Sequence, residues 1–127
     1  MVSTNQITIG IVGAGGDGVV TLGDMLAEAA ARDGLHVVKT DAYGAQIRGG
    51  ESSTNLRIGS RQLLAPGSAA DLLIVFSEAD FARFKGDVAP AHGAVVLCEG
   101  EPSAPSPTTL GGVVMPSGAQ CVPVPFV

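Results

Sequence analysis

The sequence contains few residues of the kinds that nucleic-acid and membrane binding require. Tryptophan is absent and aromatic residues make up 4% of the 127-residue chain, which leaves little material for base stacking. Seven Lys and Arg are outnumbered by twelve Asp and Glu, giving a net charge of −5, and no basic run could follow a phosphate backbone. We therefore expect neither nucleic acid nor an anionic membrane surface as a partner.

Long apolar runs and metal-binding motifs are also missing. A run such as residues 72–76 is far too short to span a bilayer, and the polar, uncharged start of the chain does not resemble a signal peptide, so we expect a cytoplasmic protein. The two cysteines, Cys98 and Cys121, lie in separate apolar stretches without CxxC or Cys/His spacing. We interpret them as buried, reduced thiols and expect no metal site.

The residues that are present follow the pattern of one α/β domain. β-branched residues from Ile7 to Val12 predict a buried first strand, and apolar positions at helical spacing predict an amphipathic helix from Asp17 to a stop at Gly34. Further strands are predicted around residues 37–38, 53–58, 71–76 and 94–98 and near the C-terminus, with a turn at 86–93 and a short helix after Ser77. The expected fold class is α/β, a Rossmann-like open, mostly parallel sheet with helices on both faces.

A glycine-rich turn, GAGGDG, occupies residues 13–18 between the first strand and the helix. It matches G-x-G-x-x-G in the context where backbone N–H groups and the helix dipole favour an anion. Asp41 lies 23 positions beyond Gly18, close to the spacing of a ribose-binding acid, so an NAD- or FAD-binding domain of a dehydrogenase is one interpretation. Asp17 would cap the helix but repel a pyrophosphate, which counts against a dinucleotide, and a purely structural assembly subunit whose glycines serve packing is a further interpretation.

A second glycine-rich segment, YGAQIRGGES, follows the second predicted strand at residues 43–52. Both segments would leave the carboxyl edge of a doubly wound sheet, so we expect them to converge on one ligand. Arg48 suits a bidentate grip on phosphate or carboxylate, or a salt bridge to Glu51 or a neighbouring subunit. Tyr43, the only tyrosine, suits stacking on a base or an interface contact.

Together with SAADLLIVFS and HGAVVL further on, these two segments resemble the γ subunit or γ domain of the 2-oxoacid:acceptor oxidoreductases over about residues 7–98. That family includes pyruvate, 2-oxoglutarate, indolepyruvate and arylglyoxylate enzymes, which depend on thiamine diphosphate and iron–sulfur clusters. The resemblance implies a non-redox subunit of a complex that oxidatively decarboxylates a 2-oxoacid to an acyl-CoA, with no complete active site in this chain.

The resemblance also implies ligands and partners. Coenzyme A would be bound partly here, by Gly13, Gly15, Gly16, Asp17, Gly18, Asp41, Tyr43, Arg48, Gly49 and Gly50. Thiamine diphosphate, magnesium and the iron–sulfur clusters, for which two cysteines are too few, would belong to α, β and ferredoxin-like δ subunits, with ferredoxin or an NAD-linked acceptor taking the electrons. Family members run on beyond this length, so we expect a single γ-type domain over residues 1–127 that lacks the family's C-terminal part or has its apolar end at Phe126 completed by a partner.

Overall fold

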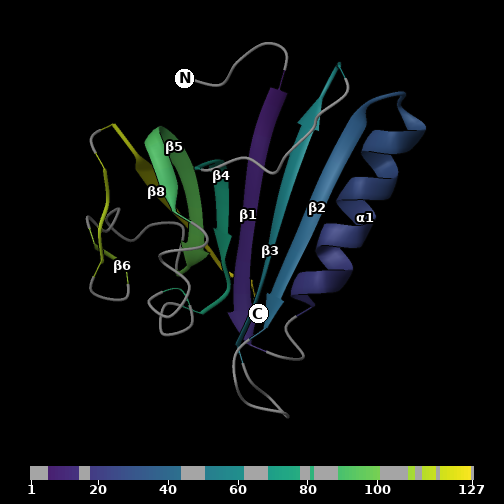
Figure 1. Cartoon of the computed structure of the whole chain (residues 1–127). Helices are drawn as coiled ribbons and strands as arrows, with labels where there is room; N and C mark the ends of the chain where they lie inside the picture. The colour runs from purple at the N-terminus through teal and green to yellow at the C-terminus, as the bar shows by residue number, and fades with distance from the viewer. Residues whose placement is uncertain are drawn as a thin grey trace.

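The structure is a computed structural model, and it describes residues 6–14, 18–43, 51–61, 69–77, 81, 89–100, 109–110, 113–116 and 118–126. The elements in chain order are β1 (Gln6–Ala14), α1 (Val19–Arg32), β2 (His36–Tyr43), β3 (Glu51–Gly59), β4 (Ala70–Val75), β5 (Pro90–Glu99), β6 (Thr109–Leu110), β7 (Val113–Val114) and β8 (Gln120–Val124). Strands β6 and β7 form a small antiparallel pair, and the other strands form one sheet with α1 against one of its faces (Figure 1).

The main sheet has six strands in the order β2-β3-β1-β4-β5-β8. Strands β1, β4, β5 and β8 are mutually parallel, while β3 runs antiparallel to both of its neighbours, β1 and β2. The α/β class and the mostly parallel sheet predicted from the sequence are therefore confirmed. Strand β1, helix α1 and strand β2 form a β-α-β unit, because β1 and β2 run parallel, but the unit is split by β3, which lies between the two strands. A parallel crossover needs about a dozen residues or more, so the short connection from Tyr43 to Glu51 returns the chain antiparallel.

Helix α1 begins and ends at glycines. Its N-cap is Gly18, at φ 86°, and not Asp17 as the sequence suggested. At the other end Gly34, at φ 83°, donates its N–H to the carbonyl of Ala31, and Leu35 donates to that of Ala30. These two bonds form a Schellman motif and confirm the predicted stop at Gly34.

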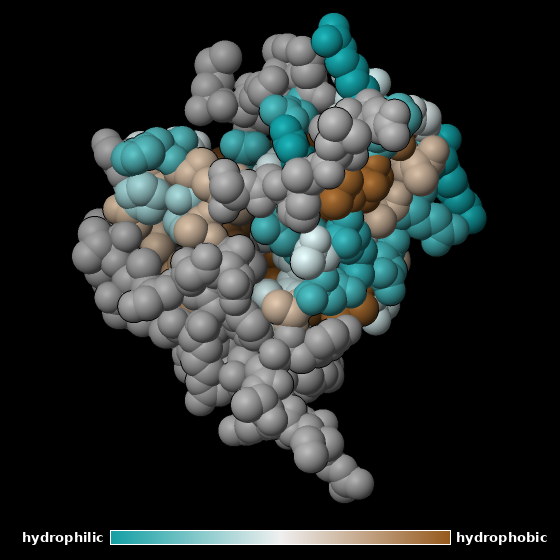
Figure 2. Space-filling model, in the orientation of Figure 1, coloured by the Kyte–Doolittle hydropathy of each residue, from teal (hydrophilic) through white to brown (hydrophobic). Residues whose placement is uncertain are grey.

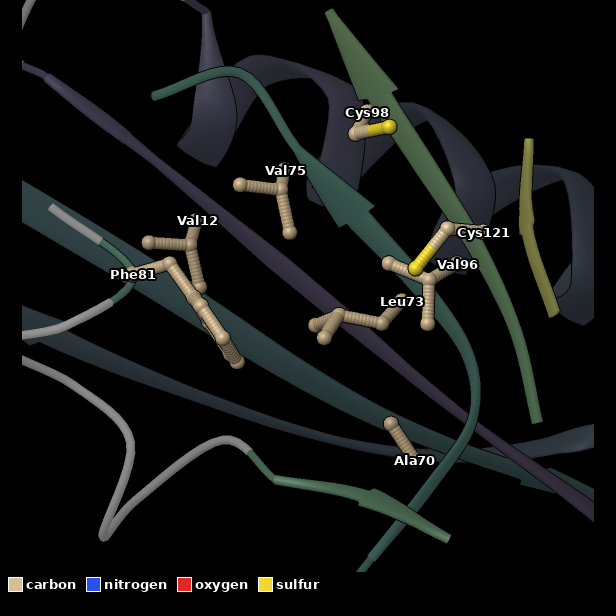
Figure 3. Close-up of a cluster of buried hydrophobic side chains, with 8 residues drawn as sticks. All are labelled: Val12, Ala70, Leu73, Val75, Phe81, Val96, Cys98 and Cys121. Atoms are coloured by element: carbon tan, nitrogen blue, oxygen red, sulfur yellow. The ribbon is translucent and has the colours of Figure 1, made fainter. Parts of the chain in front are cut away.

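Two apolar clusters lie on the two faces of the sheet, as the alternation of strand side chains dictates. The α1-side cluster joins helix residues such as Val19 and Ala30 to strand residues such as Ile11, Leu56 and Ile74. The opposite cluster, shown in Figure 3, comprises Val12, Ala70, Leu73, Val75, Phe81, Val96, Cys98 and Cys121. Both cysteines are buried and form no disulfide, in agreement with the predicted buried, reduced thiols.

The second predicted helical layer falls mostly outside the described residues. Phe81 is helical and fully buried, and its N–H donates to the carbonyl of Ser77, consistent with a helix that follows Ser77. Within the part of the chain that the structure describes, no helix is both long and apolar enough to cross a membrane.

The C-terminal half of the sheet differs in detail from the prediction. Strand β5 starts at Pro90, inside the stretch expected to be a turn, and its pairing with β4 shifts register between Ala70 and Leu72. Strand β8 takes an edge position, which suits Pro123 within it because proline has no N–H to donate to a neighbouring strand. After it, the Phe126 ring packs edge-on against Phe76 with centroids 4.8 Å apart, so this chain itself covers part of that apolar end.

Candidate functional site

The two glycine-rich segments start or finish at the same edge of the sheet. Strands β1 and β2 both end there, and β3 begins there, as the arrows in Figure 1 show. In the strand register Gly13 pairs with Ser52 and Ala14 with Glu51, while Tyr43 pairs with Ser52 from the other side. The strand residues that bound the two segments are therefore direct neighbours at one edge of the sheet, and convergence of the segments on one ligand stays a prediction.

The predicted ligand residues divide into those that the structure describes and those that it does not. Gly13 is buried near the end of β1, Gly18 is the N-cap of α1, Asp41 lies in β2 and Tyr43 is the last residue of β2. The others lie outside the described residues, as does the Tyr43 side chain, and their roles stay predictions: Gly15, Gly16, Asp17, Arg48, Gly49 and Gly50.

The N-terminus of α1 is suited to an anion. Its N-cap is a glycine, which has no side chain to cap it, and its first turn contains no acidic residue. The Gly18 carbonyl accepts the first helical hydrogen bond from Leu22 N–H at 2.8 Å, so the helix is regular from its first turn. The N–H groups of that turn and the positive end of the helix dipole therefore point toward the end of segment 13–18 without a competing carboxylate in the turn. The left-handed conformation of Gly18 is one that other residues rarely adopt.

Asp41 is engaged in a hydrogen-bonded cluster beneath α1. Lys39 Nζ donates to Asp41 Oδ1 at 2.8 Å and to Oδ2 at 2.7 Å, and Thr54 Oγ1 donates to Oδ1 at 2.7 Å. Lys39 Nζ also lies 2.9 Å from Asp24 Oδ1 on the helix. Since each carboxylate oxygen has two lone pairs, Oδ1 is saturated and only Oδ2 could accept a further hydrogen bond from a ligand.

The charges of this cluster reinforce each other. Burial would lower the pKa of Lys39, but hydrogen bonds to Asp41 and Asp24 and the attraction of their charges outweigh it and raise that pKa above its ordinary value. Burial would likewise raise the pKa of Asp41, but the hydrogen bonds from Lys39 and Thr54, with the lysine charge, lower it. The pair therefore stays ionised across the physiological range.

Lys39, Asp24 and Thr54 were not among the site residues predicted from the sequence. Asp24 is 64% exposed on the helix, yet its carboxylate reaches back to Lys39. The i, i+2 spacing of Lys39 and Asp41 on one strand was the available signal, because it places both side chains on the same face. Nothing in the sequence indicated that Thr54 of β3 would join them.

Other polar groups lie on the sheet face away from α1. Arg57 donates through Nε to Gln6 Oε1 at 2.9 Å, which ties β3 to the start of β1. The nearby Asn55 Oδ1 is buried and has no hydrogen-bond partner. Among the residues that the structure describes, no group of three or more His, Cys, Asp or Glu side chains could hold a metal ion.

Known proteins are similar to this chain over nearly its whole length. The family profile described as pyruvate ferredoxin/flavodoxin oxidoreductase matches residues 8–126. Subunit VorA of the ketoisovalerate oxidoreductase of Methanothermobacter marburgensis is 36% identical over 93 residues, 72% of this chain and 19% of the relative. Subunit IorB of the indolepyruvate oxidoreductase of Archaeoglobus fulgidus is 38% identical over 80 residues, 62% of this chain and 40% of the relative. The chain thus spans less than half the length of these curated relatives.

Two solved structures share the fold. The 2-oxoglutarate:ferredoxin oxidoreductase of Magnetococcus marinus, solved with 2-oxoglutarate, coenzyme A and succinyl-CoA bound, superposes with a TM-score of 0.78 at 25% identity and covers 97% of this chain and 20% of that one. The γ subunit of a keto/oxoacid ferredoxin oxidoreductase from Geobacter sulfurreducens gives a TM-score of 0.64 at 26% identity over 94% of this chain and 61% of that one. These matches agree with the resemblance carried by the two glycine-rich segments, and the chain belongs to the pyruvate ferredoxin/flavodoxin oxidoreductase family.

Proposed function

We propose that this chain is the non-redox γ-type part of a 2-oxoacid:acceptor oxidoreductase complex and that it binds the nucleotide end of coenzyme A. The observation that carries the proposal is the pairing of Gly13 with Ser52 and of Ala14 with Glu51, which brings the two glycine-rich segments to one edge of the sheet. Further support comes from a relative of the same fold that was solved with coenzyme A bound. We keep a cytoplasmic location as part of this proposal.

The edge of the sheet fits the phosphates of such a co-substrate. The start of α1, with glycine at its N-cap and no acidic residue in its first turn, offers backbone donors and a positive dipole. In the proposal, Gly15 and Gly16 let the backbone approach a phosphate, and Arg48 with Gly49 and Gly50 closes on the ligand from the second segment. Tyr43 stacks on the base or contacts the next subunit.

The chain's contribution would be binding and orientation rather than bond making. Coenzyme A, when bound, supplies the thiol that accepts the acyl group. Residues that hold its nucleotide end raise the effective concentration of that thiol at an active site completed by other subunits. Thiamine diphosphate, magnesium and the iron–sulfur clusters are assigned to α, β and ferredoxin-like δ partners, with ferredoxin or an NAD-linked acceptor receiving the electrons.

The dehydrogenase interpretation is weakened by the surroundings of Asp41. In a dinucleotide-binding domain the ribose-binding acid ends a strand that lies beside the first strand. Here β3 separates β2 from β1, and Asp41 already accepts three hydrogen bonds. A ribose could reach only the remaining lone pair of Oδ2, so any contact of Asp41 with a nucleotide is proposed as secondary.

The test is to purify the protein from its native source with its co-purifying chains and to assay bound iron and thiamine diphosphate. We expect larger partner chains that contain both, and a complex that binds coenzyme A but not NAD. The variant Gly16→Val should weaken coenzyme A binding, because a side chain there would block backbone approach. Unchanged coenzyme A affinity in Gly16→Val would support the structural-subunit interpretation, and a lone chain that binds NAD would contradict the proposal.

A further inference from the structure

Lys39 lies at the centre of the charged cluster beneath α1 and contacts two different elements. Its ammonium group is bound by both oxygens of Asp41 in β2 and by Asp24 in α1, at distances of 2.7 to 2.9 Å. Its side chain is 17% exposed, against 25% for Asp41. Asp41 in turn accepts a hydrogen bond from Thr54, which is fully buried in β3. One lysine therefore links the helix to the β2–β3 hairpin.

The contact is close because the helix has a glycine at this point. A Cβ atom built on Gly23 would lie 2.6 Å from Thr54 Cγ2 and 3.0 Å from Lys39 Cε. The lysine stem and the threonine methyl thus fill the space that a larger helix residue would occupy. By contrast, the Glu28–Arg32 pair joins two residues of the same helix, which are 63% and 79% exposed. The Lys39 cluster joins different elements and is reinforced by packing, whereas the Glu28–Arg32 pair is of the surface kind that contributes little.

The partners of Lys39 lie close to both glycine-rich segments. Asp24 is in the second turn of α1, whose N-cap Gly18 closes segment 13–18. Asp41 precedes the last residue of β2 by two positions, and Thr54, its register partner, is three positions into β3. A shift of α1 along the sheet would therefore move its N-cap Gly18 relative to the strand ends at Tyr43 and Ser52, and the Lys39 contacts oppose such a shift.

We propose that Lys39 is a positioning residue, which fixes α1 against β2 and so sets the position of the helix N-cap Gly18 relative to the strand ends at Tyr43 and Ser52. This inference rests on the proposed function, since it assumes that one co-substrate bridges the two segments. Its effect is exerted through the backbone donors in the first turn of α1 on one side and through the end of β2 and the start of β3 on the other.

The experiment compares variants in the native complex, assayed for coenzyme A-dependent reduction of its electron acceptor. Lys39→Met keeps the stem and removes the charge, and Lys39→Arg keeps the charge. Misplaced binding groups weaken ligand binding, so we expect Lys39→Met to raise the KM for coenzyme A by about tenfold with kcat at saturation unchanged. Lys39→Arg should recover KM to within about threefold, and the matched control Arg32→Met, on the exposed pair, should leave both parameters unchanged.

A KM for coenzyme A that does not change in Lys39→Met, together with a lower resistance to urea, would overturn the proposal and leave Lys39 a purely stabilising residue. If Lys39→Met fails to assemble, Asp24→Asn removes only the helix-side contact. It should raise the same KM by a smaller factor, and an unchanged KM there would overturn the proposal. Equilibrium dialysis of coenzyme A with the unmodified complex separates the two hypotheses: failure to bind overturns the proposed function as well, whereas binding with unaffected variants overturns only the role of Lys39.

Discussion

On one side of β1 the sheet continues as three parallel strands, β4, β5 and β8, and on the other side as the antiparallel β3–β2 hairpin. Buried residues of the parallel side are apolar, with Leu73, Val75 and Val96 almost fully enclosed. Among the described residues, all the buried polar ones lie in β1 or β3: Thr8, Ser52, Ser53 and Thr54. The parallel side thus stabilises the fold mainly through apolar burial, and the hairpin side holds its geometry through specific hydrogen bonds next to the edge where ligand binding is proposed.

The largest loss of stability is expected from a substitution on the parallel side of the sheet, at Leu73. This side chain is fully buried in the cluster of Figure 3, so Leu73→Ala should lower the free energy of unfolding by about 2–5 kcal/mol through lost burial and the cavity left behind. Urea titration of the purified chain measures it, with Val95→Ala as the control, because Val95 in the neighbouring strand is 39% exposed. An equal loss of unfolding free energy in both variants would contradict the role of the parallel side in stability. A changed KM for coenzyme A in a folded Leu73→Ala complex would contradict the assignment of ligand binding to the hairpin side.

A second prediction concerns the contact of α1 with the hairpin. In Gly23→Ala the new methyl group would approach Thr54 Cγ2, which cannot withdraw because Thr54 is buried, and the helix must shift. We expect a net loss of about 1–3 kcal/mol, even though alanine has the better helix propensity. Unlike Leu73→Ala, this change should also raise the KM for coenzyme A. Ala29→Val, which adds atoms on the exposed side of the helix, should change neither quantity appreciably, and a gain in stability on Gly23→Ala would show that the contact is looser than described.

The pH dependence of stability sharpens the comparison, because it isolates the charged part of the hairpin. The folded-state pKa of Asp41 is lowered from 3.8, so its stabilising contribution is present above pH 3.8 and is lost as the pH falls through the lower, folded value. Asp41→Asn should cost about 1–3 kcal/mol near neutral pH, and its difference from the parent should shrink on acidification below about pH 4. A difference that stays constant down to pH 2 would show that the charge of Asp41 is not what stabilises the cluster.

The raised pKa of Lys39 predicts a loss of folding stability at alkaline pH. Its contribution is complete below the unfolded value of 10.5 and is lost as the pH rises through the folded value above it. Urea midpoints measured between pH 9 and 12 should therefore fall more steeply for the parent chain than for Lys39→Met. Parallel curves would contradict an ionised Lys39 in the folded state.

The smallest effect is expected at the exposed ion pair of α1. Figure 2 shows a largely hydrophilic surface where this helix lies, and both members of the Glu28–Arg32 pair belong to that surface. Arg32→Met should change the free energy of unfolding by less than about 0.5 kcal/mol, and 1 M salt should remove most of that change because it screens exposed charges. A cost comparable to that of Lys39→Met would remove the distinction between surface and packed ion pairs.

The sequence predicted the strands and the helix because their signals are local. Alternating or continuous apolar residues identified β1, β4 and β5, and Gly34 identified the end of α1 through its left-handed conformation. The position and direction of β3 could not be predicted in the same way, because strand order depends on pairing between residues far apart in the chain. The correct clue was the length of the connection from Tyr43 to Glu51, which is too short for a parallel crossover.

The candidate site was predictable only as a pair of segments. Glycine spacing indicated that both would lie at one edge, and the register of β1 with β3 confirms this for Gly13 and Ala14. The occupation of Asp41 by Lys39 and Thr54 was not predictable as a whole, because Thr54 becomes its neighbour only once β3 pairs with β2. Spacing alone indicated Asp41 as a ribose-binding acid. In the folded protein, most of its hydrogen-bond acceptor capacity is taken up by Lys39 and Thr54.

The most direct test of the central claim is hydrogen–deuterium exchange of the native complex with and without saturating coenzyme A. The account predicts slower exchange in peptides that cover segments 13–18 and 43–52 and in the first turn of α1, with no change in β4 or β5 and no effect of NAD. Exchange that coenzyme A leaves unchanged at this edge, while the complex demonstrably binds it, would contradict the claim that this chain holds the co-substrate.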